Sequence, residues 1–173
     1  VDPTMGLLAS GQIGQGRLAD EGMILEALQT VLAPRQDLRG QRILVSAGPT
    51  QEPIDPVRFI SNRSSGKMGY AVAEAAQARG AQVILVTGPT ALPSPKGVEV
   101  ISISTAEEMT KALSTRLAWS TVLIMAAAVA DFRPKHPVSH KITKQGPSDR
   151  TLDLERTTDI LSLLSAQRTT QLM

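Results

Sequence analysis

The chain has 173 residues and a hydrophobic content of 42%, which is sufficient for one packed domain with a short appendage. Aromatic residues make up 2%, and the 18 basic and 16 acidic residues are spread along the chain, so the composition disfavours a nucleic-acid partner. The absence of cysteine excludes disulfides and thiolate metal sites, and no apolar run reaches the roughly 18 residues of a membrane span, so we expect a cytoplasmic protein without membrane contact.

The first 41 residues are expected to stand apart from the main domain. Four glycines in residues 6–17 predict a flexible loop, and an amphipathic helix follows near residues 21–32, with Pro34 ending it. Residues 36–41 are polar and predict a linker. The chain also opens at Val1 rather than Met, which favours a piece of a longer polypeptide.

From residue 42 onward, short apolar runs alternate with helical patterns. This alternation predicts an α/β fold, a Rossmann-like three-layer α/β/α domain with a mainly parallel sheet. A long loop is expected at residues 48–64 and a polar loop at 131–150. The expected elements are a strand at 42–46, a helix at 65–79 capped by Gly80, strands at 82–87 and 98–103, a helix from the capping-box sequence 105–108 to 118, strands at 121–127 and 151–155, and a helix opened by 157–159.

The segment RFISNRSSGKMG, residues 58–69, lies between a strand and a helix. Its serines and glycines stand where free N–H groups and the helix dipole favour an anion, so phosphate binding is one interpretation. A turn that only caps the helix is the other interpretation, because the segment matches neither a Walker loop nor G-x-G-x-x-G. The residues concerned are Ser64, Ser65, Gly66 and Gly69.

The loop after the first strand, residues 48–56, contains a glycine and three prolines. A stiff loop at the carboxyl end of a strand can line a nucleotide pocket, or it can be a rigid surface excursion. Its two acids, Glu52 and Asp55, are either solvated or bind a magnesium-phosphate complex.

Two later segments also carry candidate chemistry. MAAAVADF, residues 125–132, leaves a buried strand with small residues that either expose backbone groups to a ligand or allow close helix packing, and Asp131 can accept hydrogen bonds from a ligand. In KITK, residues 141–144, the lysines either reach triphosphate oxygens or are solvated. His136 and His140 receive no role, and no protein metal ligand is predicted.

The segments GPTQEPIDPVRFISNRSSGKMGYAVAEAA, MAAAVADFRP and KITK, in this order, closely resemble the phosphopantothenate–cysteine ligase family over residues 42–164. LASGQIGQGRLAD resembles the closing flap of phosphopantothenoylcysteine decarboxylase, which precedes the ligase in bacterial bifunctional proteins. The resemblance implies that residues 1–35 are the tail of the decarboxylase domain, 36–41 a linker and 42–173 a ligase domain that lacks its C-terminal segment. FMN would belong to the absent decarboxylase domain, and Ser10 at the position of the flap cysteine predicts no decarboxylase activity here.

The resemblance also implies the reaction and the assembly. A multifunctional enzyme of coenzyme A biosynthesis would use CTP with Mg²⁺ to convert 4′-phosphopantothenate to an acyl-cytidylate, which cysteine then turns into 4′-phosphopantothenoylcysteine. Since the chain has no cysteine, the cysteine is a substrate. A homodimer is implied, because Arg58 of such proteins reaches the substrate phosphate in the neighbouring subunit's site.

Residue roles follow from the resemblance position by position. The catalytic residues would be Asn62 and Lys141. The nucleotide would contact Gly48, Ser64, Gly66, Gly69, Met125, Ala126, Ala127, Asp131, Lys141, Thr158, Asp159, Ile160 and Leu161. The phosphopantothenate would contact Arg58, Asn62, Ala127, Ala128 and Asp131.

Two alternatives to a ligase remain. Because the family's last segment is missing, the fragment is either inactive by itself or a non-catalytic nucleotide-binding module. A Rossmann oxidoreductase ranks lower, since G-x-G-x-x-G and the acidic ribose partner are missing after the first strand.

Overall fold

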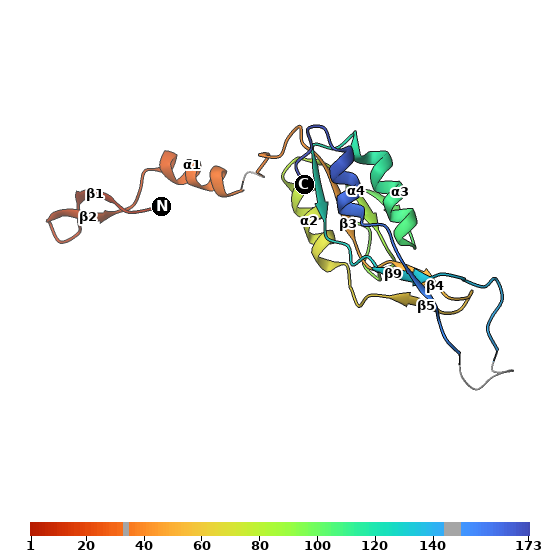
Figure 1. The fold of residues 1–173 in the computed structure, drawn as a ribbon. Coiled ribbons are helices and arrows are strands. Elements are labelled where there is room, and N and C mark those ends of the chain that lie inside the picture. The colour runs from red at the N-terminus through yellow and green to blue at the C-terminus, as the bar shows by residue number, and fades with distance from the viewer. Residues whose placement is uncertain (33–34, 144–149) are drawn as a thin grey trace. The chain divides into compact units, whose positions relative to one another are not determined.

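The computed structural model describes residues 1–32, 35–143 and 150–173 (Figure 1). The chain divides into two compact units, Val1–Arg35 and Gln36–Met173. The division falls where the linker was expected to begin. That the first unit is a decarboxylase tail stays a prediction. None of the helices in the described residues is long and apolar enough to cross a membrane.

The first unit contains a hairpin and a helix. Strands β1 (Thr4–Leu7) and β2 (Ile13–Arg17) pair antiparallel, so the loop expected at residues 6–17 is wrong. Two of the four glycines lie against Leu8, since Cβ atoms on Gly14 and Gly16 would be 3.2 and 3.1 Å from its methyl carbons. Helix α1 (Glu21–Leu32) is confirmed at the expected bounds, and Pro34, expected to end it, lies outside the described residues.

The second unit is built on a four-stranded parallel sheet in the order β7-β6-β3-β8. Its central strand β3 is buried from Ile43 to Ala47, which is why this run is continuously apolar apart from Ser46. The chain moves from β3 to β6 and β7 on one side and returns to β8 on the other. The topological switch point therefore lies between β3 and β8. The strands are β3 (Arg42–Ala47), β6 (Gln82–Thr87), β7 (Glu99–Ser102) and β8 (Val122–Met125).

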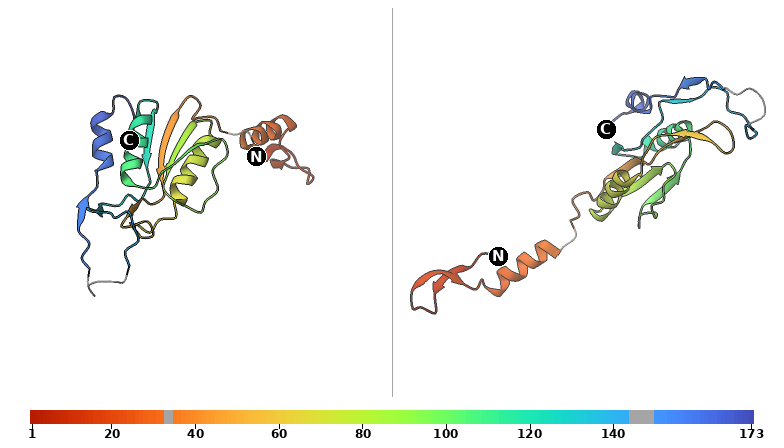
Figure 2. Two further views of the ribbon diagram at one scale, coloured as in Figure 1. Left: turned by 90° about the vertical axis from the view of Figure 1, so that its right-hand side faces the viewer. Right: turned by 90° about the horizontal axis from the view of Figure 1, so that it is seen from below.

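Helices cover both faces of this sheet, which confirms the three-layer α/β/α fold (Figure 2). Alternate residues of β3 point to opposite layers: Val45 packs with α2 (Lys67–Ala78), and Leu44 packs with α3 (Ala106–Leu117) and α4 (Ile160–Gln167). The capping box of α3 is confirmed, since Thr105 Oγ accepts the Glu108 N–H and the Glu108 carboxylate accepts the Thr105 N–H.

Two regions that were expected to be loops contain short strands. Strands β4 (Gln51–Pro53) and β5 (Phe59–Ser61) form a hairpin, and β9 (Phe132–Pro134) pairs antiparallel with β10 (Leu154–Arg156). Each strand has three residues, too few to show an alternating pattern in the sequence, and only β10 overlaps an expected strand, the one at 151–155. In Figure 1 these strands lie beyond the carboxyl ends of the main sheet.

Candidate functional site

The loops after β3 and β8 run side by side at the switch point. Pro49 and Ala128 form a parallel bridge, and the Ala128 N–H donates to Gly48 O at 2.8 Å. Ser46 Oγ accepts the N–H groups of Ala126 and Ala127 at 3.1 and 3.2 Å. These three alanine amides are therefore bonded within the chain rather than exposed to a ligand, and the Ala128 carbonyl also accepts the Thr50 N–H at 3.3 Å.

Asn62 is tethered to the same place. Its Nδ2 donates to Val129 O at 2.9 Å and to Ala128 O at 3.4 Å. Beside it, buried Thr50 accepts the Ala130 N–H through Oγ1 at 3.0 Å, and Ser61 Oγ donates to Thr50 O at 2.7 Å. The structure thus brings the predicted Asn62 and Ala128 together, and it adds Ser46, Thr50 and Ser61, which sequence reasoning missed.

The start of α2 packs closely against the end of β3. Gly66 precedes the helix with φ +74°, and a Cβ there would lie 2.8 Å from Thr90 Cγ2 and 3.4 Å from the Cα of Gly48. A Cβ on Gly69 would lie 2.5 Å from Ala47 Cβ. Ser64 Oγ accepts the Gly66 N–H at 3.3 Å within the turn, but Gly66 is the N-cap of α2 and the helix has no side-chain cap hydrogen bond. Phosphate binding at this turn stays a prediction.

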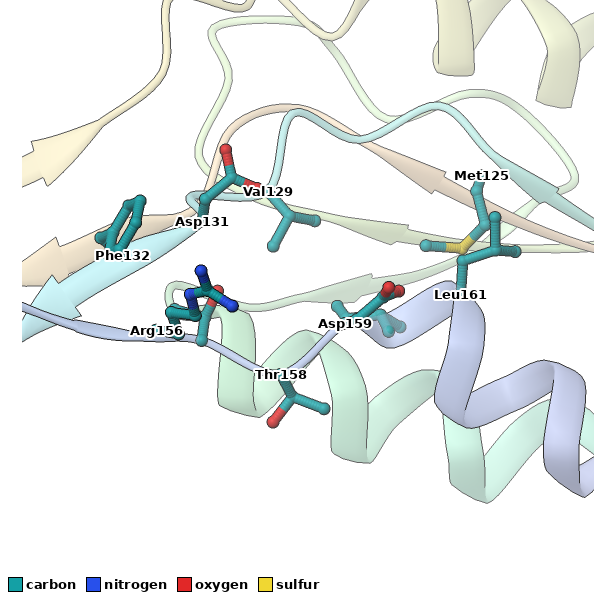
Figure 3. Close-up of a pocket in the computed structure, with 10 residues that line it drawn as sticks. Met125, Val129, Asp131, Phe132, Arg156, Thr158, Asp159 and Leu161 are labelled. Carbon is teal, nitrogen blue, oxygen red and sulfur yellow. The ribbon is translucent and has the colours of Figure 1, made fainter.

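A pocket of about 570 Å³ opens beside these loops (Figure 3). One wall comes from the loop after β8 and the other from the segment between β10 and α4. Six predicted nucleotide-site residues line it, namely Met125, Asp131, Thr158, Asp159, Ile160 and Leu161, together with Val129, Phe132, Arg156 and Thr157, which were not predicted. We call the pocket and the loops that hold it, residues 46–50, 62, 125–132 and 156–161, the pocket frame.

Thr157 joins the two walls of the pocket. Its N–H donates to Asp131 O at 3.0 Å and its hydroxyl to Ala130 O at 2.6 Å. Asp159 begins α4, where its carboxylate accepts the Ser162 N–H at 3.0 Å and the Ser162 hydroxyl at 2.8 Å. These hydrogen bonds hold the pKa of Asp159 below its usual range. A helix opened by residues 157–159 was expected from the sequence, and Asp159 is the residue that caps it, whereas its contact with a nucleotide stays a prediction.

Arg58 and Lys141 do not line the pocket. They lie where the turn of the β4–β5 hairpin meets residues 138–142. Arg58 pairs with Asp55 in the turn of the β4–β5 hairpin and donates to Ile142 O at 2.9 Å, next to exposed Lys141. The Val138 N–H donates to Ile54 O at 3.1 Å. We call residues 54–58 with 138–142 the hairpin arm. Lys144, the second lysine of KITK, lies outside the described residues.

The two acids of the β4–β5 region are buried, so their interpretation as solvated residues is wrong. Glu52 is 2% exposed and accepts the Ala106 N–H at the start of α3 at 2.8 Å. Asp55 is 3% exposed, and the Arg58 guanidinium holds its pKa far below the usual range, although burial acts in the opposite direction. Within residues 1–32, 35–143 and 150–173, no group of three or more His, Asp or Glu could hold a metal ion.

The strand order defines a Rossmann-like α/β domain, and the pocket lies beside the loop that follows β8, at the edge of the sheet where such domains bind their ligands. Residues 38–173 match the family described as the DNA/pantothenate metabolism flavoprotein C-terminal domain. The chain belongs to this family, which confirms the resemblance stated from the sequence motifs.

Curated relatives agree with this membership. The Coenzyme A biosynthesis bifunctional protein CoaBC of Bacillus subtilis is 43% identical over 176 residues, covering 100% of this chain and 43% of the relative. The protein of the same name from Mycobacterium tuberculosis H37Rv is 47% identical over 167 residues, covering 94% of this chain and 40% of the relative. The chain thus spans less than half the length of these relatives.

A solved structure shows the same fold. The crystal structure of the C-terminal domain of a Coenzyme A biosynthesis bifunctional protein CoaBC superimposes with a TM-score of 0.69 at 47% identity. The match covers 79% of this chain and 63% of that one.

Proposed function

We propose that the protein carrying this chain is a phosphopantothenate–cysteine ligase of coenzyme A biosynthesis, a cytoplasmic homodimer that uses CTP. In the first step, a carboxylate oxygen of 4′-phosphopantothenate attacks the α-phosphorus of CTP, and pyrophosphate leaves. In the second step, the amine of cysteine attacks the acyl carbon and loses a proton, the bond to the phosphate oxygen breaks, and CMP leaves. The product is 4′-phosphopantothenoylcysteine.

The observation that carries the proposal is the position of Asn62. Its side-chain amide reaches from the hairpin to the carbonyls of Ala128 and Val129, so two of the motifs of the resemblance meet at the switch point. An open α/β sheet binds its ligand at this place. Because Nδ2 donates to these two carbonyls, Oδ1 is the amide atom that can accept a hydrogen bond from a substrate, without adding charge beside a phosphate.

The pocket frame supplies the proposed nucleotide contacts. Asp131 and the segment from Thr158 to Leu161 line opposite walls, so a nucleotide between them is shielded from water on two sides. Arg156 adds a positive charge to the same pocket, which suits a ligand with phosphate groups. Glu52 and Asp55, the two acids of the family motif, are not proposed to bind the ligand, because their carboxylates already accept backbone N–H groups of the chain.

Mg²⁺ in this proposal is bound by the triphosphate oxygens, which are its preferred ligands, and supplies charge stabilisation there. The described residues fit a metal that arrives with the nucleotide, because their buried carboxylates already accept backbone N–H groups. Lys141 and Arg58 would balance the remaining charge on the triphosphate and on the substrate phosphate.

The reaction is tested on the full-length gene product with CTP, Mg²⁺, 4′-phosphopantothenate and cysteine. We expect release of pyrophosphate and formation of phosphopantothenoylcysteine, with CTP preferred to ATP. Pyrophosphate release without cysteine in a single turnover would identify the acyl-nucleotide step. If neither pyrophosphate nor the amide forms with CTP or ATP, the proposal is wrong.

The dimer is tested by mixing two inactive variants. In the proposed dimer the hairpin arm acts on the partner's pocket, so an Asn62→Asp protomer paired with a Lys141→Gln protomer regains one intact site. Random pairing of equal amounts puts one intact site in half of the dimers, so about a quarter of the normal activity is expected. If the mixture stays as inactive as each variant alone, Lys141 acts on its own subunit's pocket.

A further inference from the structure

The carboxylate of Asp55 lies at the centre of the hairpin arm, and its two oxygens have different partners. Oδ1 accepts the backbone N–H groups of Val57 and Arg58, both at 2.8 Å, and so closes the hairpin turn. Oδ2 accepts Arg58 Nε at 3.0 Å and the Ile142 N–H at 3.1 Å, and it also contacts Arg58 Nη2. One oxygen therefore stabilises the turn, and the other joins the turn to a distant part of the chain.

The contact with Ile142 spans 87 residues of sequence. Arg58 Nη2 donates to Ile142 O at 2.9 Å, so Asp55 and Arg58 hold the N–H and the C=O of the same residue. A second attachment, from the Val138 N–H to Ile54 O, holds the other end of the segment. The backbone next to Lys141 is therefore fixed to the residue that orients Arg58.

Only an ionised acid can make all of these contacts. Five N–H groups converge on the two oxygens, and a carboxylate accepts on both, whereas an amide accepts on one only. The side chain of Asp55 is fully buried, and that of Arg58 is half exposed, so Arg58 neutralises the buried charge while part of its guanidinium stays accessible. Asp55 therefore orients Arg58 without removing it from solvent.

We propose that Asp55 is a positioning residue that holds Arg58 and the backbone beside Lys141 in one fixed arrangement, so that both cations act at the same ligand site. This inference rests on the proposed function for the roles of Arg58 and Lys141. Asp55 itself contacts no substrate. A carboxylate that only stabilised the turn would need Oδ1 alone. The bonds of Oδ2 to Arg58 and Ile142 are the evidence for a positioning role.

The test uses Asp55→Asn, because asparagine can keep the Oδ1 bonds but places an N–H₂ group where Oδ2 was. Hydrogen exchange of the 173-residue chain is expected to show exchange of the Ile142 amide faster by about tenfold or more, with Val57 and Arg58 still protected. Asp37→Asn is the matched control, since it alters another bidentate aspartate–arginine pair, with Arg79 at 2.9 and 2.6 Å, and should leave all three amides unchanged.

Kinetics of the full-length gene product then separate positioning from structure. In Asp55→Asn, we expect KM for the phosphorylated substrates to rise and the rate of pyrophosphate release to fall together by about tenfold, with KM for cysteine unchanged. Inactivity of the unmodified protein would contradict the proposed function. The hydrogen-exchange result would then still test whether Asp55 holds the Ile142 backbone. Unchanged Ile142 exchange in Asp55→Asn would overturn the positioning role.

A second variant is needed in case the Asp55→Asn protein does not fold. Asp55→Ser retains an oxygen that can accept the Val57 N–H and has no second oxygen for Ile142. Faster exchange at Ile142 in this variant supports the proposal. If both variants unfold while Asp37→Asn does not, Asp55 holds the domain together rather than positioning two side chains, and the proposal is overturned.

Discussion

The pocket frame and the hairpin arm are held by different kinds of contact. In the pocket frame, neutral groups such as Ser46, Thr50 and Asn62 bond to backbone that continues the sheet past its carboxyl edge. In the hairpin arm, one buried carboxylate and one arginine hold two chain segments. The bonds that these neutral groups make should therefore resist changes of salt and pH, and the geometry of the arm should depend on the charge of Asp55.

The difference suggests a division of labour within the proposed ligase. The pocket frame provides a fixed surface on which a nucleotide is placed, as electrostatic preorganisation requires. The hairpin arm carries the two cations, Arg58 and Lys141, outside the lining of the chain's own pocket. Variants of the frame should therefore affect folding or the chemical step, and variants of the arm should affect binding of phosphorylated ligands.

Asn62→Asp should give the largest effect, because it places a carboxylate beside the Ala128 and Val129 carbonyls and removes the N–H donors. In the full-length gene product we expect the second step to slow by about a hundredfold or more, so that the acyl-cytidylate accumulates. Quenched-flow analysis with labelled CTP measures it. Gln41→Glu, the same change at an exposed position before β3, is the control, and normal turnover of Asn62→Asp would contradict the role of Asn62.

Gly69→Val tests whether close packing fixes α2 against the pocket frame. The first added carbon already meets Ala47 Cβ at 2.5 Å and Ser46 O at 2.9 Å, so the helix must move. We expect a loss of about 3 kcal/mol in the free energy of unfolding, measured with urea. Ala71→Val, on the exposed side of the same helix, should cost about 0.5 kcal/mol. Equal losses in the two variants would show that the glycine is not required for packing.

Thr50→Val removes one bond of the pocket frame while keeping the shape of the side chain. The Ala130 N–H loses its partner in a buried place, and we expect a loss of about 2 kcal/mol in the free energy of unfolding that does not change with salt. Thr110→Val is the control, because its hydroxyl bonds to the Ala106 carbonyl within helix α3, where that oxygen has other partners. A salt-dependent loss would contradict the neutral character of the frame.

The central sheet and its helices could be predicted from the sequence because their signals are local. The strand after Arg42 is apolar apart from Ser46, and Thr105 and Glu108 form a capping box within four residues. The hairpin β4–β5 and strand β9 could not be predicted, because each strand is three residues long and depends on distant partners, whereas β10 falls at the end of the strand expected at 151–155. Glu52 illustrates this, since its carboxylate is buried only because the start of α3, 54 residues away, donates an N–H to it.

The candidate site divides in the same way. The resemblance assigned Asp131 and residues 158–161 to a nucleotide, and the structure places all of them around one pocket. Thr157 and Arg156 were missed because their importance depends on the loop after β8, to which Thr157 bonds. Asp55 was interpreted as an acid in a loop, either solvated or binding a magnesium-phosphate complex. Its burial follows from contact with Ile142, and no local pattern indicates that contact.

The smallest effect expected is a dependence of stability on pH that arises in the hairpin arm. The Arg58 guanidinium lowers the pKa of Asp55 in the folded chain, whereas in the unfolded chain the carboxyl titrates near its ordinary value of about 3.9. A lowered folded pKa means that the stabilisation is fully present above the unfolded value and is lost as the pH falls toward the folded one. The sign is therefore a loss of stability in acid.

The measurement compares the free energy of unfolding of the unmodified chain and of Asp55→Asn between pH 7 and pH 2. The difference between them should be constant down to about pH 5 and should shrink below about pH 4, because only the unmodified chain loses the contribution of this carboxylate. Asp159→Asn provides a comparison from the pocket frame, where Ser162 lowers the pKa of the acid by neutral hydrogen bonds. Added salt should reduce the Asp55 difference more than the Asp159 difference, since the arm contains an ion pair and the cap does not. An equal response of both to salt would remove the distinction between an ionic arm and a neutral frame.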